Sequence, residues 1–184
     1  MLRVLDLVLA GAGLLALSPL MIVLFVAALV DTGAPIFSQV RVGRYQRPFT
    51  LLKFRTMRQG THSVPTHLVD PSAVTLLGSV LRRSKLDELP QLWNVLRGDM
   101  SLVGPRPCLS IQHALIAERE IRGVFAVRPG ITGLAQVQGI DMSTPQTLAE
   151  ADARMLENLD ATAYLGYLLQ TLTGAGSGDR LRPP

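Results

Sequence analysis

The feature that most constrains this 184-residue chain is a long, uncharged apolar segment close to its start. Residues 7–30 contain no charged side chain. A straight helix of that length would reach ~36 Å, which is enough to cross the ~30 Å hydrocarbon core of a bilayer. The segment is too long for the apolar core of a signal peptide, and no polar cleavage region follows it. We therefore expect a membrane helix over residues 1–31.

Ser18 and Pro19 lie near the middle of this segment. A proline removes one hydrogen bond within a helix, and a serine hydroxyl can satisfy a carbonyl that the proline frees. The segment can therefore form a kinked helix that spans the membrane, or a helix–break–helix that enters and leaves by the same face. Hydropathy alone favours the spanning form, because kinked spans are more common.

The sequence GAGLLA at residues 11–16 formally matches the dinucleotide-binding fingerprint, and Asp31 lies at about the distance expected of a ribose contact. However, Pro19 would fall inside the helix that this fold requires, and no strand–helix alternation follows Asp31. A dinucleotide-binding domain is therefore disfavoured.

The segment that follows the apolar helix is basic. No acidic residue lies between Asp31 and Asp70, a window that contains Arg41, Arg44, Arg47, Lys53, Arg55 and Arg58. Basic residues directly after an apolar helix mark its cytoplasmic side and attract anionic lipid or phosphate groups. A pI near 9.8 would also suit nucleic acid. Aromatic residues make up only 5% of the chain, too few for base stacking, so we expect no nucleic-acid partner.

The remaining sequence predicts one mostly helical α+β domain over residues 32–173, followed by a flexible tail over residues 174–184. Apolar and polar residues alternate over residues 35–57 around a turn, which predicts a short β-hairpin. Residues 128–137 contain two glycines and predict a loop. This loop either packs closely against the rest of the domain or binds a diphosphate or nucleotide through its backbone N–H groups. Glu150, Asp152, Glu157 and Asp160 fall on an expected amphipathic helix. That helix continues into residues 164–172, which pack in the core or lie in the membrane interface.

The number and spacing of the cysteine and histidine residues predict neither a disulfide nor a zinc site. Cys108 is the one cysteine, and we expect a buried structural thiol there. His62, His67 and His113 lack the spacing of metal ligands, and the first two lie in a predicted mobile loop at residues 59–71.

The candidate catalytic centre is the one pair of adjacent acidic residues, Asp87 and Glu88. It lies in LRRSKLDELPQLWNVLRGDMSLVGPRP, residues 81–107, among Arg82, Arg83, Lys85, Arg97 and Arg106. A carboxylate that must meet a phosphorylated substrate needs its charge offset by arginines or by a divalent cation. Asp87 and Glu88 could therefore serve as nucleophile and metal ligand. A solvated ion-pair patch at a helix start explains such a cluster equally well.

The apolar spacing predicts a helix over residues 87–96. Pro90 belongs in its first turn, which places Asp87 at or near the N-cap, where the helix dipole keeps a carboxylate ionised. Gly98 ends the helix, and the rigid turn GPRP at residues 104–107 could aim Arg106 back at the acidic pair. An ionised aspartate beside phosphate-binding side chains has the attributes of a covalent nucleophile.

With these motifs in this order, the chain resembles the small bacterial sugar transferases, the monotopic phosphoglycosyl transferases that start glycan assembly on polyprenyl phosphate. The resemblance covers essentially the whole chain, from the Ser18-Pro19 helix through PIFSQVRVG, KFRTM, KLDELPQLWNVLRGDMSLVGPRP and RPGITGLAQV. It implies that Asp87 attacks the sugar-bearing phosphate of a UDP-sugar and expels UMP, and that undecaprenyl phosphate then accepts the phosphosugar. It also implies that Glu88 holds Mg²⁺ and that substrate or phosphate is bound by Arg82, Arg106, Arg128 and Gln136.

The resemblance also concerns the membrane. It implies that the helix broken at Ser18 and Pro19 is re-entrant, contrary to hydropathy alone. Met1 and the catalytic domain would then both lie on the cytoplasmic face of the bacterial inner membrane, with amphipathic helices at the membrane surface.

Two positions depart from the family pattern. Family members often carry Arg where Leu76 stands and a basic residue where Ile140 stands. Both changes lie outside the acidic pair, so we still expect catalysis. They leave open which sugar the chain transfers. The sequence also leaves open the glycan pathway and the oligomeric state, a homodimer included. A second hypothesis is a non-catalytic, membrane-anchored adaptor that binds anionic lipid or a glycan-assembly enzyme, although an adaptor has no need of the acidic pair.

Overall fold

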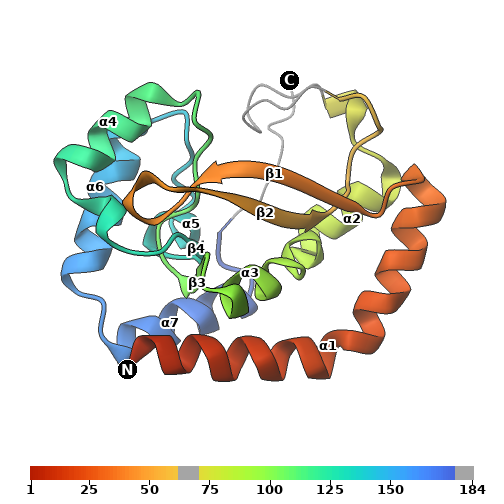
Figure 1. Cartoon of the computed structure of the whole chain (residues 1–184), viewed down its shortest axis with the longest axis horizontal. Coiled ribbons are helices and arrows are strands. Elements are labelled where there is room, and N and C mark those ends of the chain that lie inside the picture. Colours follow the sequence, from red (N-terminus) through yellow and green to blue (C-terminus); the bar gives the residue numbers. More distant parts are fainter. Residues whose placement is uncertain (62–70, 177–184) are drawn as a thin grey trace.

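The structure is a computed structural model that describes residues 1–61 and 71–176. Within these residues helices outweigh strands, and four short strands form two separate two-stranded sheets (Figure 1). This arrangement confirms the predicted mostly helical α+β class. Several predictions fall wholly or largely outside the described residues: the loop at 59–71, the tail at 174–184, His62 and His67.

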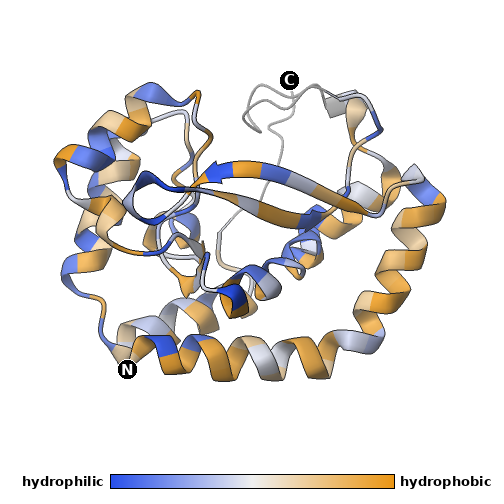
Figure 2. Cartoon of the chain, in the orientation of Figure 1, coloured by the Kyte–Doolittle hydropathy of each residue, from blue (hydrophilic) through white to orange (hydrophobic). Residues whose placement is uncertain are grey.

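The apolar segment forms one bent helix, α1 (Leu2–Thr32), whose first half runs along the domain and whose second half turns up its side (Figure 1). Pro19 lies inside the helix, and the Ser18 hydroxyl donates to the Leu15 carbonyl at 2.8 Å. A missing N–H and a serine bonded back to the preceding turn are recognised causes of such a bend. Figure 2 shows that α1 is apolar over most of its length.

Within the described chain, α1 is the one helix long and apolar enough to cross a membrane. Its most apolar window has a mean hydropathy of 2.6 and is only 11% buried. A soluble core helix would be mostly buried, so the exposed apolar surface of α1 indicates membrane association.

The predicted hairpin is confirmed. Strands β1 (Ile36–Val42) and β2 (Pro48–Phe54) pair antiparallel, with Ile36 opposite Phe54 and Val42 opposite Pro48. The turn contains the short 3₁₀ helix η1 (Arg44–Gln46). Asn94 joins this hairpin to helix α3 (Gln91–Arg97): its side chain accepts from the Leu52 amide at 3.0 Å and donates to the Thr50 carbonyl at 2.7 Å.

The second sheet lies at the centre of the helical part of the domain. Strands β3 (Ser101–Val103) and β4 (Gly130–Thr132) run parallel. The other helical elements are η3 (Pro71–Ala73), α2 (Leu76–Ser84), η4 (Leu86–Glu88), α4 (His113–Ile121), η5 (Val124–Ala126), α5 (Leu134–Val137), α6 (Pro145–Glu157) and α7 (Ala161–Leu172).

Both halves of α1 pack against this domain. The first half contributes Ala10 to a core shared with Val95 of α3, β3 and Tyr164 of α7. The second half contributes Leu24 to a separate cluster with Phe54 of β2 and Leu81 of α2. The apolar helix therefore covers two sides of the same domain, and its outer face stays exposed.

Polar contacts fix both ends of α1 as well. Asp6 is 3% exposed, and its Oδ1 accepts hydrogen bonds, each of 2.8 Å, from Ser101 Oγ, the Leu102 amide and the Tyr164 hydroxyl. Burial and the bond to Asp6 raise the pKa of Tyr164, so this phenol remains a donor. At the other end, Thr75 Oγ1 donates to Asp31 at 2.6 Å.

Two predicted helices are each interrupted. The helix expected over residues 87–96 is the 3₁₀ turn η4 followed by α3, which begins only after Pro90. The prediction was wrong because Pro90 lacks an N–H, and tighter i to i+3 bonds, such as Leu89 N to Leu86 O at 3.3 Å, precede it. The single C-terminal helix was also wrong: Asp160 caps a new helix, α7, by accepting from the Ala163 amide.

The network around Asp6 predicts a large stability difference between two carboxylates on one helix. Asp6→Ala should destabilise the protein by about 2–4 kcal/mol, because the Leu102 amide and the Tyr164 hydroxyl would lose their acceptor in the core. Asp31→Ala, at the exposed end, is the matched control and should lower the melting temperature far less. Thermal unfolding of both variants in the same detergent, followed by circular dichroism, measures the difference. Equal losses would contradict the structural role of Asp6.

Candidate active site

The acidic pair lies in a tight turn that the end of α2 creates. Lys85 closes α2 in the left-handed conformation, with φ of 58°. This conformation costs a residue with a side chain roughly 1–2 kcal/mol. It directs the chain into η4, where Leu86 and Leu89 pack against the cluster that contains Phe54. The apolar contacts of these two leucines thus fix the turn that carries Asp87 and Glu88.

The two carboxylates have different surroundings. Asp87 is 3% exposed and so is shielded from bulk water. The side chain of Glu88 is 11% exposed, and its Oε1 lies 2.9 Å from Arg106 Nη2 and 3.4 Å from Lys53 Nζ. Partly buried ion pairs of this kind are screened much less by salt than pairs on the surface. The Glu88 carboxylate therefore contacts two cations, one from the hairpin and one from the turn after β3.

The structure brings together three of the sequence-predicted residues, Asp87, Glu88 and Arg106, and places Arg82 on the neighbouring turn. Arg82 extends from the last turn of α2, where its Nε donates to Thr56 Oγ1 at 2.8 Å. Arg106 comes from the turn after β3, so its contact with Glu88 joins two parts of the fold. The predicted return of the GPRP turn towards the acidic pair is confirmed.

Arg128 and Gln136 make their contacts elsewhere. Arg128 Nε donates to the Gly98 carbonyl at 2.8 Å, at the opposite end of α3 from the acidic pair. Gln136 Nε2 donates to the Gly104 carbonyl at 3.3 Å, and so holds the turn that carries Arg106. These contacts are of the close-packing kind, and direct substrate contact by either side chain stays a prediction.

Sequence reasoning missed Lys53, Arg119 and Asp152. Lys53 lay in the KFRTM motif, but no local pattern showed that it would reach Glu88. Arg119 and Asp152 form an ion pair of 2.7 Å with side chains 2% and 0% exposed. A signal for this pair existed: each charge lies in the apolar stripe of its helix, four residues after Leu115 in α4 and four residues after Leu148 in α6.

Cys108 is fully buried, as expected of a structural thiol, and its burial raises its pKa. Ile140, one of the two expected departures from the family pattern, packs against the buried apolar cluster that contains Cys108, Leu115 and Leu148. Leu76, the other departure, is 92% exposed at the start of α2. An apolar side chain so exposed on an amphipathic helix suits contact with a lipid surface.

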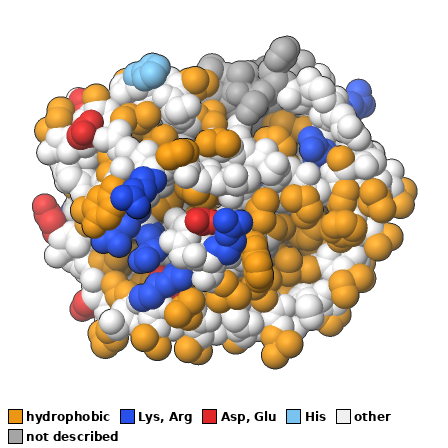
Figure 3. Space-filling view, in the orientation of Figure 1, with side chains coloured by type: hydrophobic (Ala, Val, Ile, Leu, Met, Phe, Trp, Pro, Cys, Tyr) orange, Lys and Arg blue, Asp and Glu red, His pale blue; other side chains and the backbone are white. Residues whose placement is uncertain are grey.

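The surface of the molecule is divided by residue type. In the face shown in Figure 3, hydrophobic side chains dominate the side towards the second half of α1, whereas Lys and Arg gather toward the centre and left. On α7, Leu165, Leu169 and Leu172 form an exposed apolar stripe at helical spacing. The 164–172 segment therefore buries Tyr164 in the core and exposes this stripe.

Comparison with known proteins agrees with this architecture. The sequence model of the family "Bacterial sugar transferase" matches residues 1–177. The uncharacterized sugar transferase EpsL of Bacillus subtilis (strain 168) is 44% identical over 140 residues, which cover 74% of this chain. The UDP-glucose:undecaprenyl-phosphate glucose-1-phosphate transferase of Caulobacter vibrioides is 39% identical over 86% of the chain. The undecaprenyl-phosphate galactose phosphotransferase of Salmonella typhimurium is 38% identical over 92% of the chain.

The matches span 69%, 61% and 39% of these three proteins, respectively. The family match covers nearly the whole chain, including α1, the hairpin, the acidic pair and the GPRP turn. The chain therefore belongs to the bacterial sugar transferase family.

Proposed function

We propose that this chain transfers a sugar 1-phosphate from a UDP-sugar to undecaprenyl phosphate, as the first membrane step of bacterial glycan assembly. The names of the Caulobacter and Salmonella relatives describe this class of reaction. The observation that carries the proposal is the buried Asp87 next to Glu88, whose carboxylate contacts Arg106 and Lys53. An adaptor would gain nothing from paired acids enclosed with two cations, because such a cluster costs desolvation energy.

Asp87 is the nucleophile in this mechanism. One of its carboxylate oxygens attacks the phosphorus that bears the sugar; the bond from that phosphorus to the UMP oxygen breaks, and UMP leaves with the electron pair. An oxygen of undecaprenyl phosphate then attacks the same phosphorus and releases the Asp87 carboxylate, which yields the undecaprenyl diphosphate sugar. Covalent catalysis divides the transfer into two steps, so the water-soluble donor and the lipid acceptor need not be bound together. The burial of Asp87 limits hydrolysis of the intermediate.

Glu88 fits a role in holding Mg²⁺. Mg²⁺ prefers oxygen ligands and is usually held by one or two carboxylates together with substrate phosphates. Because Lys53 and Arg106 already pair with Glu88, a bound diphosphate needs further positive charge. Mg²⁺ would supply that charge, and Arg82 would add to it.

The direct test of the function is UMP release from a panel of UDP-sugars, with undecaprenyl phosphate as acceptor. Asp87→Asn should lower turnover by roughly 10³-fold or more, because an amide cannot form the acyl phosphate. Wild-type protein incubated with labelled UDP-sugar alone should retain the label covalently, and Asp87→Asn should not. Turnover of Asp87→Asn near the wild-type rate would exclude the covalent mechanism, and no UMP release from any sugar would favour the adaptor.

The metal assignment makes a separate prediction. Glu88→Gln should lower the rate of UMP release by about 10²- to 10³-fold. Excess EDTA should abolish UMP release by the wild type, and added Mg²⁺ should restore it. Glu118→Gln is the control, since Glu118 pairs with Arg122 on the surface of α4. Full activity in excess chelator would rule out the metal.

We further propose that α1 is re-entrant and that the catalytic domain lies on the cytoplasmic face. A helix that crosses a bilayer places its ends on opposite faces, ~30 Å apart. Here both ends are bonded to one domain, through Asp6 and through Asp31. The basic segment that follows α1 and the cytoplasmic location of nucleotide sugars support the same face. The Ser18 hydroxyl limits the cost of the break by satisfying a backbone carbonyl.

Cysteine labelling can test this topology. A cysteine inserted between Met1 and Leu2 should not react with a membrane-impermeant maleimide in intact spheroplasts, and should react after lysis. The native Cys108 is fully buried and provides no background. Replacement of Ser18 by Ala and Pro19 by Leu should straighten α1, and Asp6→Ala should release its start from the domain. The combined variant is then expected to label in intact cells. Labelling of the parent would show that α1 already spans the membrane.

A further inference from the structure

The turn that carries Arg106 is fixed by hydrogen bonds to its backbone carbonyls. Prolines at positions 105 and 107 have no N–H, so the carbonyls are the main groups by which the protein can fix this turn. Every carbonyl from residue 104 to residue 108 accepts a hydrogen bond. The donors, in order, are Gln136 Nε2 (3.3 Å), the Gly130 amide (2.9 Å), Arg119 Nη1 (2.8 Å), Arg41 Nη1 (3.2 Å) and the Val42 amide (2.9 Å).

The middle donor, Arg119, differs from the others because it is a fully buried charge. Its Nε and Nη2 donate to Asp152 Oδ2 at 2.9 and 2.7 Å, and its Nη1 donates to the Arg106 carbonyl. Arg119 comes from α4 and Asp152 from α6, so the pair also joins two helices to the turn. A planar guanidinium can bind two partners in fixed directions at once, which lysine cannot do equally well.

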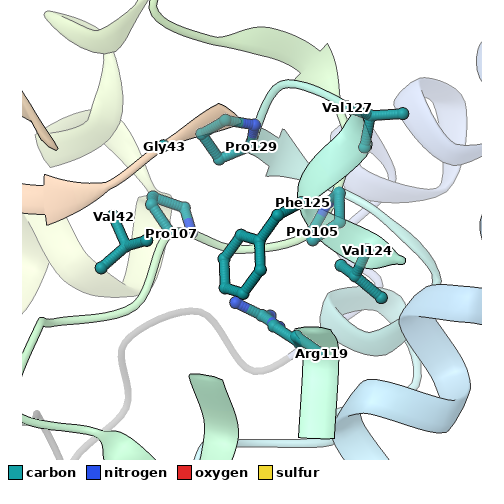
Figure 4. A pocket seen from close by; sticks show the side chains of 9 residues that line it. All are labelled: Val42, Gly43, Pro105, Pro107, Arg119, Val124, Phe125, Val127 and Pro129. Atoms are coloured by element: carbon teal, nitrogen blue, oxygen red, sulfur yellow. The ribbon is translucent and has the colours of Figure 1, made fainter. Parts of the chain in front are cut away.

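Arg119 is not placed to bind substrate. Its side chain lies below Phe125 in this view and lines a small pocket together with Phe125, Pro105 and Pro107 (Figure 4). The pocket has a cavity volume of ≈ 10 Å³, which is room for about one water molecule. Neither a nucleotide nor a phosphate fits there.

Stability alone does not account for this ion pair. Burial of two charges carries a large desolvation penalty, and well-packed apolar residues of similar volume often serve stability as well or better. An apolar pair, however, cannot donate a hydrogen bond to the Arg106 carbonyl. The distinctive property of Arg119 is therefore this directed bond.

We infer that Arg119, oriented by Asp152, is a positioning residue that holds Arg106 at the distance from which its guanidinium reaches Glu88. The inference rests on the proposed function, in which Arg106 and Glu88 act on the diphosphate. The chain of contacts runs from Asp152 through Arg119 to the Arg106 backbone, and from the Arg106 side chain to Glu88 at 2.9 Å. Displacement of a catalytic group by about 1 Å can lower a rate by about 10²-fold.

The decisive variant replaces the pair by apolar residues, Arg119→Met together with Asp152→Leu. It should melt within a few degrees of the wild type, and its kcat for UMP release should fall about 10- to 100-fold. A purely structural pair would leave kcat unchanged well below the melting temperature, because the folded fraction would be the same. Arg122→Met with Glu150→Leu is the matched control, since this more exposed pair joins the residue after α4 to α6 and should leave kcat unchanged.

A second variant, Arg119→Lys, keeps the positive charge beside Asp152 but loses the fork that also reaches the Arg106 carbonyl. It should fold and show a similar loss of kcat. If either variant folds and keeps the kcat of the wild type, the inference is wrong. The proposed function would still stand, because the wild-type protein itself would be active. If neither variant folds, the pair serves stability and the inference fails. A wild type that releases no UMP would instead refute the proposed function.

Discussion

The buried carboxylate of Asp6 is the contact on which the arrangement of the whole chain depends. It joins α1 to Ser101, 95 positions along the chain, and to Tyr164, 158 positions along it. A buried carboxyl group is stable only when hydrogen-bonding partners surround it, and here three donors and the nearby Arg3 do so. If the start of the apolar helix left the domain, Asp6 would enter lipid without its hydrogen-bond donors, and those donors would lose their acceptor. This attachment of both ends of α1 to one domain supports the proposed re-entrant topology, whereas hydropathy alone favours a spanning helix.

The candidate site depends on a second junction of the same kind. The hairpin, α2 and η4 position Lys53, Asp87 and Glu88, whereas the turn after β3 positions Arg106. Arg106 and Lys53 neutralise Glu88 before a substrate arrives, so the protein can keep two adjacent acids in a partly buried place. An incoming diphosphate would compete with Glu88 for these cations, and Glu88 would then be available to a divalent cation. Under the proposed function, this exchange of partners requires the acids and the bases to lie within contact distance.

Local patterns predicted those parts of this fold that local forces decide. The β-hairpin follows from strand alternation around a turn, and the end of α3 from Gly98, which adopts φ of 91°. The start of α3 could not be read in the same way, because Pro90 lacks an N–H and the 3₁₀ turn before it packs Leu86 and Leu89 against Phe54, which is distant in sequence. Asp87, Glu88 and Arg106 were identifiable by residue type and motif. Lys53 had no local signal, because its partner Glu88 is 35 positions away. Arg119 and Asp152 were marked only by their place in the apolar stripes of α4 and α6, which did not show that they pair with each other.

Four buried polar residues in the described chain share one property: each lies where separate parts of the fold meet. Asp6 joins α1 to β3 and α7, Asn94 joins α3 to the hairpin, and Arg119 with Asp152 joins two helices to the GPRP turn. Hydrophobic contacts contribute most of the folding free energy, but they are non-directional and tolerate small shifts. Hydrogen bonds in a low-dielectric interior are directional and costly to break. The apolar core thus brings the hairpin and the turn together, and the buried polar contacts fix the distance between Glu88 and Arg106.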